Sequence, residues 1–161
     1  MLAYAALQEG DLQQAGILFE ESVDLLRAAQ EPWSLGILLS DLAALRVLEG
    51  RYAEAGALAR EALGFCRSLG DRRGVGWCLQ TIAMVEASEG QASLAASLYG
   101  AAEAVLESMG ATGQVTVTRV QDRYLGFAME ALGEPAYRKA VAAGRALPLQ
   151  RALDAALQRR R

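Results

Sequence analysis

The sequence predicts an all-α fold, in which antiparallel helix pairs stack into a right-handed α-solenoid with a C-terminal helical cap. Hydrophobic residues, mostly Ala and Leu, make up 53% of the chain, and only three of its 161 residues are prolines. Such a composition favours helices. The dipeptide Glu-Gly also recurs every forty residues, at 9–10, 49–50 and 89–90. A fixed period in this range is typical of stacked helix pairs.

The forty-residue period extends beyond this dipeptide. A shift of the chain by forty aligns Ala15 with Ala55 and Ala95, Leu18 with Leu58 and Leu98, and Gly36 with Gly76. We expect the glycine of each Glu-Gly pair to end one helix in the left-handed conformation, and the alanine five residues later to begin the inner face of the next. The expected helices therefore lie near 1–9, 12–29, 33–49, 52–69, 73–89 and 92–109.

The order of residues within each period resembles the tetratricopeptide repeat, which has Ala, an aromatic and a small residue after a glycine turn. Ala95, Tyr99 and Ala102 occupy those positions after Gly90. The usual repeat has about 34 residues, so the resemblance implies longer helices here. The first repeat opens at Met1 with about half a helix, and we expect either a fragment of a longer protein or a start within a repeat array.

Beyond residue 110 the period stops, and three further helices are expected. The first covers 115–132 and ends at Gly133, with an apolar side formed by Val117, Val120, Tyr124, Phe127, Met129 and Leu132. The second covers 134–144, with Pro135 in its first turn and Gly144 at its end. The third begins at Pro148. We therefore assign 1–110 to tetratricopeptide-like repeats, the first truncated, and 111–161 to C-terminal capping helices that cover the open end.

Two segments of this tail carry a further resemblance. "AASLYGAAEAVLESMGA" at 95–111 and "ALGEPAYRKAVAAGRALPLQRALDAAL" at 131–157 resemble the C-terminal end of large bacterial transcriptional regulators. Those proteins join a STAND or NB-ARC ATPase to a tetratricopeptide array, often with a LuxR-type DNA-binding domain. The chain departs from their pattern at Ala140-Val141, where Ala-Trp is usual. The resemblance implies the repeat domain of a signal-transduction regulator, with ATP and DNA bound elsewhere in the parent chain.

Composition argues against catalysis and against several ligands. The chain has no histidine, which excludes Ser-His and Cys-His catalysis and histidine-ligated metals. We expect no enzyme activity, no cofactor and no metal. Cys66 and Cys78 could form a disulfide across the turn at 70–74, but in the cytoplasm two buried thiols are the stronger expectation. The adjacent carboxylates Glu20 and Glu21 do not face each other on a helix, so a solvated face is expected there.

Charge and hydropathy give the expected location. The net charge is −3, and the arginines at 159–161 suit a helix C-terminus, so we expect no direct contact with nucleic acid. No apolar run is long enough for a membrane span, and no signal peptide is recognisable. We expect a cytoplasmic protein.

The predicted binding site is the inner groove of the solenoid. Counting back from each turn glycine gives the residues expected to line it: Tyr4, Leu7, Ile37, Ser40, Ala44, Val47, Trp77, Gln80, Met84 and Ala87. Trp and Tyr are favoured anchors at interfaces, although a tryptophan at helical spacing is also typical of a core. The set contains neither Lys nor Asn, which argues against a clamp for a peptide's terminal carboxylate.

These observations favour a non-catalytic protein-interaction or sensor module. Its partner would be a protein, a peptide or another domain of the parent chain. One alternative is a small-molecule sensor with an enclosed pocket near Tyr4, Trp77 and Met84. Another is a self-associating scaffold, since the truncated first repeat exposes Leu2, Tyr4 and Leu7.

Overall fold

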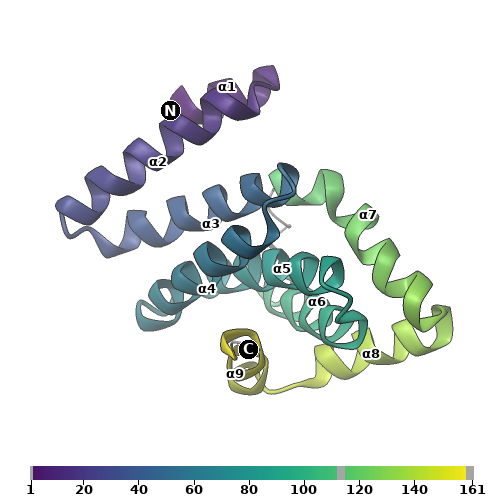
Figure 1. The fold of residues 1–161 in the computed structure, drawn as a ribbon. Helices are drawn as coiled ribbons and strands as arrows, with labels where there is room; N and C mark the ends of the chain where they lie inside the picture. The colour runs from purple at the N-terminus through teal and green to yellow at the C-terminus, as the bar shows by residue number, and fades with distance from the viewer. Residues whose placement is uncertain (1, 112–114, 159–161) are drawn as a thin grey trace.

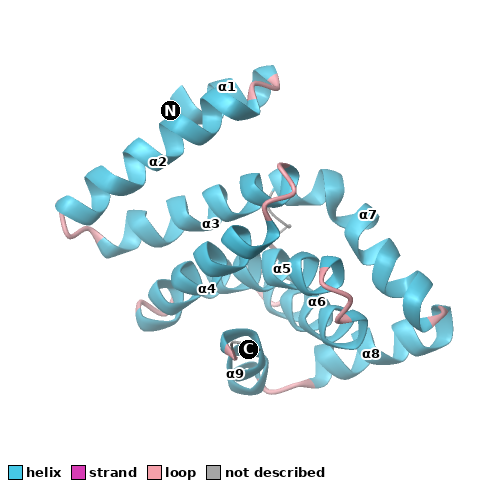
Figure 2. Ribbon diagram, in the orientation of Figure 1, coloured by secondary structure: helices cyan, strands magenta, loops and turns pink. Residues whose placement is uncertain are grey.

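The computed structural model describes residues 2–111 and 115–158, and within these ranges the chain is helical without strands (Figures 1 and 2). The helices are α1 (Leu2–Glu9), α2 (Leu12–Ala28), α3 (Pro32–Leu48), α4 (Tyr52–Ser68), α5 (Arg72–Ser88), α6 (Ala92–Glu107), α7 (Val115–Leu132), α8 (Glu134–Ala146) and α9 (Leu149–Leu157). The predicted all-α class is therefore confirmed. None of these helices is both long and apolar enough to cross a lipid bilayer. The predicted basic helix end at 159–161 lies outside the described residues.

The helices from α2 to α6 begin every twenty residues. Each forty-residue period therefore contains two helices at equal spacing along the chain. Helices α2 to α5 have 17 residues each, and three residues connect each helix to the next. The predicted turn glycines are confirmed, since Gly50 and Gly90 end their helices with φ of 75° and 79°. Gln30 takes the same conformation with φ of 54°, although it carries a side chain.

We call the pairs α1–α2, α3–α4 and α5–α6 units 1, 2 and 3. Within units 2 and 3 the two helices pack tightly against each other, and each unit contacts the next along the chain. The repeated alanines Ala15, Ala55 and Ala95 are completely buried. Small side chains at these positions let neighbouring helices approach closely, which explains why the same residue returns in every unit.

Helix α7 does not continue the stacking of the first six helices. It packs against α3, α5 and α6 together, and Figure 1 shows it running beside these helices to meet α8. The predicted apolar side of α7 is only partly correct. Tyr124 is buried, but Phe127 and Met129 are each 44% exposed, and Leu125 and Ala128 are buried instead. The side chains of Val117 and Val120 lie outside the described residues.

Helix α8 packs mainly on α6, and two glycines make this crossing possible. A Cβ atom at Gly144 would lie 1.9 Å from the carbonyl oxygen of Ser97, and one at Gly100 would lie 2.1 Å from that of Val141. The prediction that Gly144 ends this helix is wrong, because α8 continues to Ala146. Gly144 allows backbone contact between helices rather than a turn.

Helix α9 is the last helix of the described residues, and it packs against α5 and α6. The sequence predicts an apolar stripe of Leu149, Leu153, Ala156 and Leu157 on this helix. Leu153 and Ala156 are buried, Leu149 and Leu157 are half-buried, and Ala152 is buried as well. Arg60 of α4 donates a hydrogen bond from Nε to the carbonyl oxygen of Ala156 at 3.0 Å. This bond satisfies a carbonyl in the last turn of α9, where helices leave such groups without helical partners.

The crossing of α6 and α8 gives a stability prediction with a matched control. Gly144→Ala should lower the free energy of unfolding by about 1–3 kcal/mol, the usual cost of overpacking, because the added methyl group meets a backbone oxygen. Gly64→Ala on α4 should instead raise it by up to about 1 kcal/mol, since nothing lies within 4 Å of a Cβ atom there. Urea unfolding of both variants measures the difference, and equal effects would contradict the close crossing.

Candidate partner-binding surfaces

The ten residues predicted to line the inner groove differ widely in exposure. Tyr4 is 40% exposed, and Leu7, Ile37 and Trp77 are half-buried. The other six are buried: Ser40, Ala44, Val47, Gln80, Met84 and Ala87. Most of this face therefore has no access to a partner while α7 and α8 hold their present positions. We call the surface of α3 and α5 that carries Ala44, Val47 and Met84 the inner face.

Tyr124 of α7 occupies the inner face. Its ring packs in one apolar cluster with Ala44, Val47 and Met84. Its hydroxyl donates a hydrogen bond to the carbonyl oxygen of Val47 at 3.0 Å and accepts one from the hydroxyl of Tyr52 at 3.3 Å. Nearer the end of α7, Ala128 is buried against Ala87 in a second cluster. The inner face thus already holds a helix, anchored by a tyrosine.

The phenol of Tyr124 is suited to this anchoring role. Burial, and then the hydrogen bond with Tyr52, raise its pKa to about 12. The hydroxyl therefore stays protonated at neutral pH and remains a donor to Val47. The rings of Tyr52 and Tyr124 also meet edge to face, with 5.8 Å between their centroids, a favourable arrangement for aromatic pairs.

Tyr4 belongs to a different surface at the N-terminal end of the molecule. An open cleft of about 580 Å³ lies between α1, α2 and α3, and its apolar lining includes Leu2, Tyr4, Leu18, Leu25, Leu26 and Leu38. The ring of Tyr4 packs edge to face on Phe19, and its hydroxyl bonds to Asp41. Tyr4 and Met84 therefore do not share a cavity, since Met84 is buried under Tyr124.

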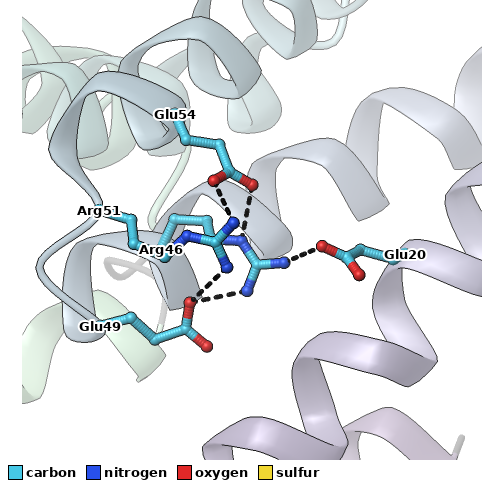
Figure 3. Close-up of polar contacts among 5 residues, drawn as sticks. All are labelled: Glu20, Arg46, Glu49, Arg51 and Glu54. Atoms are coloured by element: carbon cyan, nitrogen blue, oxygen red, sulfur yellow. Dashed lines mark hydrogen bonds and ion pairs between the residues drawn. The ribbon is translucent and has the colours of Figure 1, made fainter.

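A buried arginine joins units 1 and 2. Arg46 of α3 is 2% exposed, and its guanidinium pairs with Glu20 of α2, with Glu49 at 2.7 Å and with Glu54 of α4 at 2.9 Å (Figure 3). Arg51 pairs with Glu49 and Glu54 from the exposed side. The predicted solvated face at Glu20 is thus partly wrong, because this carboxylate is half in solvent but also binds Arg46.

The next pair of units repeats this contact with the charges exchanged. Arg60 of α4 pairs with Glu86 of α5 at 2.7 Å. Arg60 follows Glu20 by forty residues, and Glu86 follows Arg46 by forty. Neither pair was predicted from the sequence, although an opposite-charge exchange at both aligned positions is a signal that could have identified them.

The remaining candidate residues are the two cysteines, and both lie in the protein core. Cys66 and Cys78 are free and buried, in agreement with the expected thiols. Their mutual hydrogen bond and burial raise the pKa of Cys78 well above its usual value, which keeps it a neutral thiol. Among the described residues, no three His, Cys, Asp or Glu side chains form a group able to hold a metal ion.

Comparisons of the chain with protein-family models, with curated proteins and with solved structures found no match. The inner face under α7 and the cleft at the N-terminal end are candidate binding surfaces of the described residues.

The arginine cluster gives a stability prediction. Arg46→Ala should lower the free energy of unfolding by about 3 kcal/mol, because it removes a buried cation and leaves three carboxylates facing one another. Arg51→Ala is the matched control, since Arg51 contacts two of the same carboxylates but is about half exposed. Its removal should change stability by less than about 1 kcal/mol. Chemical denaturation of both variants tests this. Similar losses of unfolding free energy would show that burial does not make Arg46 more important for stability than Arg51.

Proposed function

We propose that this chain is a non-catalytic protein-interaction and sensor module, built as a tetratricopeptide-like right-handed solenoid whose inner face binds a helix. The observation that carries the proposal is the packing of Tyr124 from α7 against Ala44, Val47 and Met84. A partner helix with an aromatic anchor would use the same contacts.

The repeat geometry supports a tetratricopeptide-like arrangement. Helices α2 to α6 begin every twenty residues and have nearly equal lengths, a regularity typical of stacked helix pairs. In such arrays one helix of each pair lines a concave surface. The predicted groove residues Ala44, Val47 and Met84 lie together on neighbouring helices, as this arrangement requires.

The proposed mechanism is competition between α7 and the partner. A partner helix that binds the inner face displaces α7, which is joined to α8 by the single residue Gly133. Binding and release are then two populated states whose ratio depends on the partner's concentration and affinity. A regulator could use this change to signal from the repeat domain to a neighbouring domain.

The tail motifs favour a particular context for this module. Their likeness to the C-terminal ends of STAND and NB-ARC transcriptional regulators supports a cytoplasmic repeat domain of an ATP-dependent bacterial regulator. In that context the chain itself would bind neither ATP nor DNA.

Opening the inner face tests the proposed function. In the full chain, Tyr124→Ala should weaken the packing of α7 on the inner face by about 3 kcal/mol or more, the usual cost of deleting a buried aromatic ring. A labelled peptide of residues 115–132 should then bind the variant at least about tenfold more tightly than the unmodified protein. Fluorescence anisotropy measures both affinities, and circular dichroism checks that the helices persist.

Phe127→Ala is the matched control, because Phe127 lies on the same helix but is 44% exposed. This variant should bind the peptide no better than the unmodified chain. If Tyr124→Ala disturbs folding, Tyr124→Phe keeps the ring, removes only the hydrogen bonds, and should give a smaller change in the same direction. Equal peptide affinities for all these proteins would refute the inner face as a helix-binding surface.

The proposed context has its own test. The genomic reading frame that contains this chain should encode a phosphate-binding loop of the type GxxxxGK[ST] upstream of the repeats. A short isolated gene would contradict the assignment to an ATP-dependent regulator, while leaving the interaction module itself untouched.

A further inference from the structure

A small polar cavity of about 150 Å³ lies where α5, α6 and α7 meet. Gln80 of α5 and Gln121 of α7 line it together with Tyr99, Glu103 and Glu107 of α6. These three residues of α6 are spaced by four, so they lie on one face of that helix. The cavity is separate from both the apolar contacts of Tyr124 and the cleft at the N-terminal end.

Two amide oxygens at this cavity have no hydrogen-bond partner among the described residues. Gln80 is 5% exposed, and its Oε1 atom is buried without a donor. Gln121 donates from Nε2 to the hydroxyl of Tyr99 at 3.2 Å, which fixes the direction of its amide, and its Oε1 atom is also buried without a donor. Buried acceptors without donors are destabilising and rare in folded proteins. Two of them at one cavity call for a ligand that donates hydrogen bonds.

The tyrosine at this cavity has no proton left for a ligand. The hydroxyl of Tyr99 donates to Oε1 of Glu103 at 2.7 Å. Burial, and then this hydrogen bond with Glu103, raise the pKa of Tyr99, so the hydroxyl stays protonated and its one proton remains on this bond. The amide oxygens and the carboxylates are therefore the groups that can bind a ligand, and all of them are acceptors.

The charges around the cavity favour a cation. Arg145 of α8 pairs with both glutamates, but its distance to Glu103 is 3.3 Å, whereas it makes two hydrogen bonds to Glu107. The negative charge of Asp122 on α7 also contributes to the raised pKa of Tyr99, so a third carboxylate acts on the same site. An excess of one sign of charge at a cavity attracts ligands of the opposite sign.

We propose that this cavity binds the primary ammonium group of a small organic amine. An alkylammonium group carries a positive charge and three N–H donors but no acceptor. It can therefore donate to Gln80, Gln121 and Glu103 together. A metal ion suits the cavity less well, because the described residues contain no group of three His, Cys, Asp or Glu side chains able to hold one.

The size of the cavity limits the ligand. A water molecule takes about 30 Å³ in the liquid, so a volume of about 150 Å³ holds an ammonium group with only a short alkyl chain. The side chain of Glu107 is 58% exposed and marks the solvent side of the cavity. The remainder of a longer amine would extend in that direction.

The site has a consequence for α7. Gln121 precedes Tyr124 by three residues, so both lie on the same side of this helix. An amine that bridges Gln80 and Gln121 holds α7 on the inner face and thereby opposes a partner helix that competes with α7. The binding site itself goes beyond the proposed function and does not depend on it; only this coupling rests on the proposed function.

Titration of the full protein with ethylammonium chloride tests the site. Nuclear magnetic resonance should show saturable shifts of the side-chain amide signals of Gln80 and Gln121. The expected affinity is in the millimolar range, because so few non-hydrogen atoms limit the binding free energy. Tetramethylammonium chloride is the matched control at the same ionic strength, since it has the charge but no N–H donor, and it should give no saturable shift.

Two protein variants locate the site. Gln80→Leu should weaken ethylammonium binding by about tenfold or more, measured on the Gln121 signals, because it removes a hydrogen bond to a charged group. It should not lower the urea midpoint of unfolding, since it removes a buried acceptor without a partner. Gln14→Leu is the matched control, because Gln14 is exposed on α2, and it should leave the affinity unchanged.

Several results would overturn the amine site. They are the absence of saturable shifts with ethylammonium, equal binding of tetramethylammonium, and unchanged affinity in Gln80→Leu. Saturable shifts with potassium chloride alone would also overturn it, because a bare cation would then be the ligand.

Hydrogen exchange tests the coupling to α7 separately. Ethylammonium should slow amide exchange in α7 of the unmodified protein, but not in Gln80→Leu. Binding without slower exchange would refute the coupling and leave the amine site in place. Failure of the peptide experiment with Tyr124→Ala refutes helix binding at the inner face and likewise leaves the amine site in place.

Discussion

Close approach between helices, made possible by glycine and alanine at the contact points, is the constraint on which this structure depends. Where two backbones nearly touch, as at Gly100 and Gly144, no side chain fits and the position of one helix fixes that of the other. The same constraint operates inside units 2 and 3 at Gly36 and Gly76. Because α8 is held on α6 in this way, α7 is tied at its C-terminal end and lies across the inner face.

The inner face and the N-terminal cleft are both apolar. The inner face carries Ala44, Val47 and Met84, and leucines of α1, α2 and α3 line the cleft. The chain covers the inner face through Tyr124 of α7. At the N-terminal cleft, Leu25 of α2 is 71% exposed.

Much of the helical pattern follows from the sequence, because turn glycines and repeated alanines act locally. Gly50 and Gly90 predict helix ends correctly, and Pro135 predicts a first turn. Gly144 shows the limit, since a glycine before a turn and a glycine at a helix crossing look alike in sequence. The inner groove could be located but its covering could not, because the contact of Tyr124 with Val47 joins residues 77 positions apart. No periodic signal relates them.

The exchanged ion pairs determine which units can be neighbours. Glu20 meets Arg46 between units 1 and 2, and Arg60 meets Glu86 between units 2 and 3. If α2 of one molecule stacked on α5 of another, Glu20 would face the buried carboxylate of Glu86. An unpaired charge in that position is unfavourable. The alternation of sign thus disfavours domain swapping and misaligned stacking between units of similar structure, the errors to which repetitive chains are most exposed.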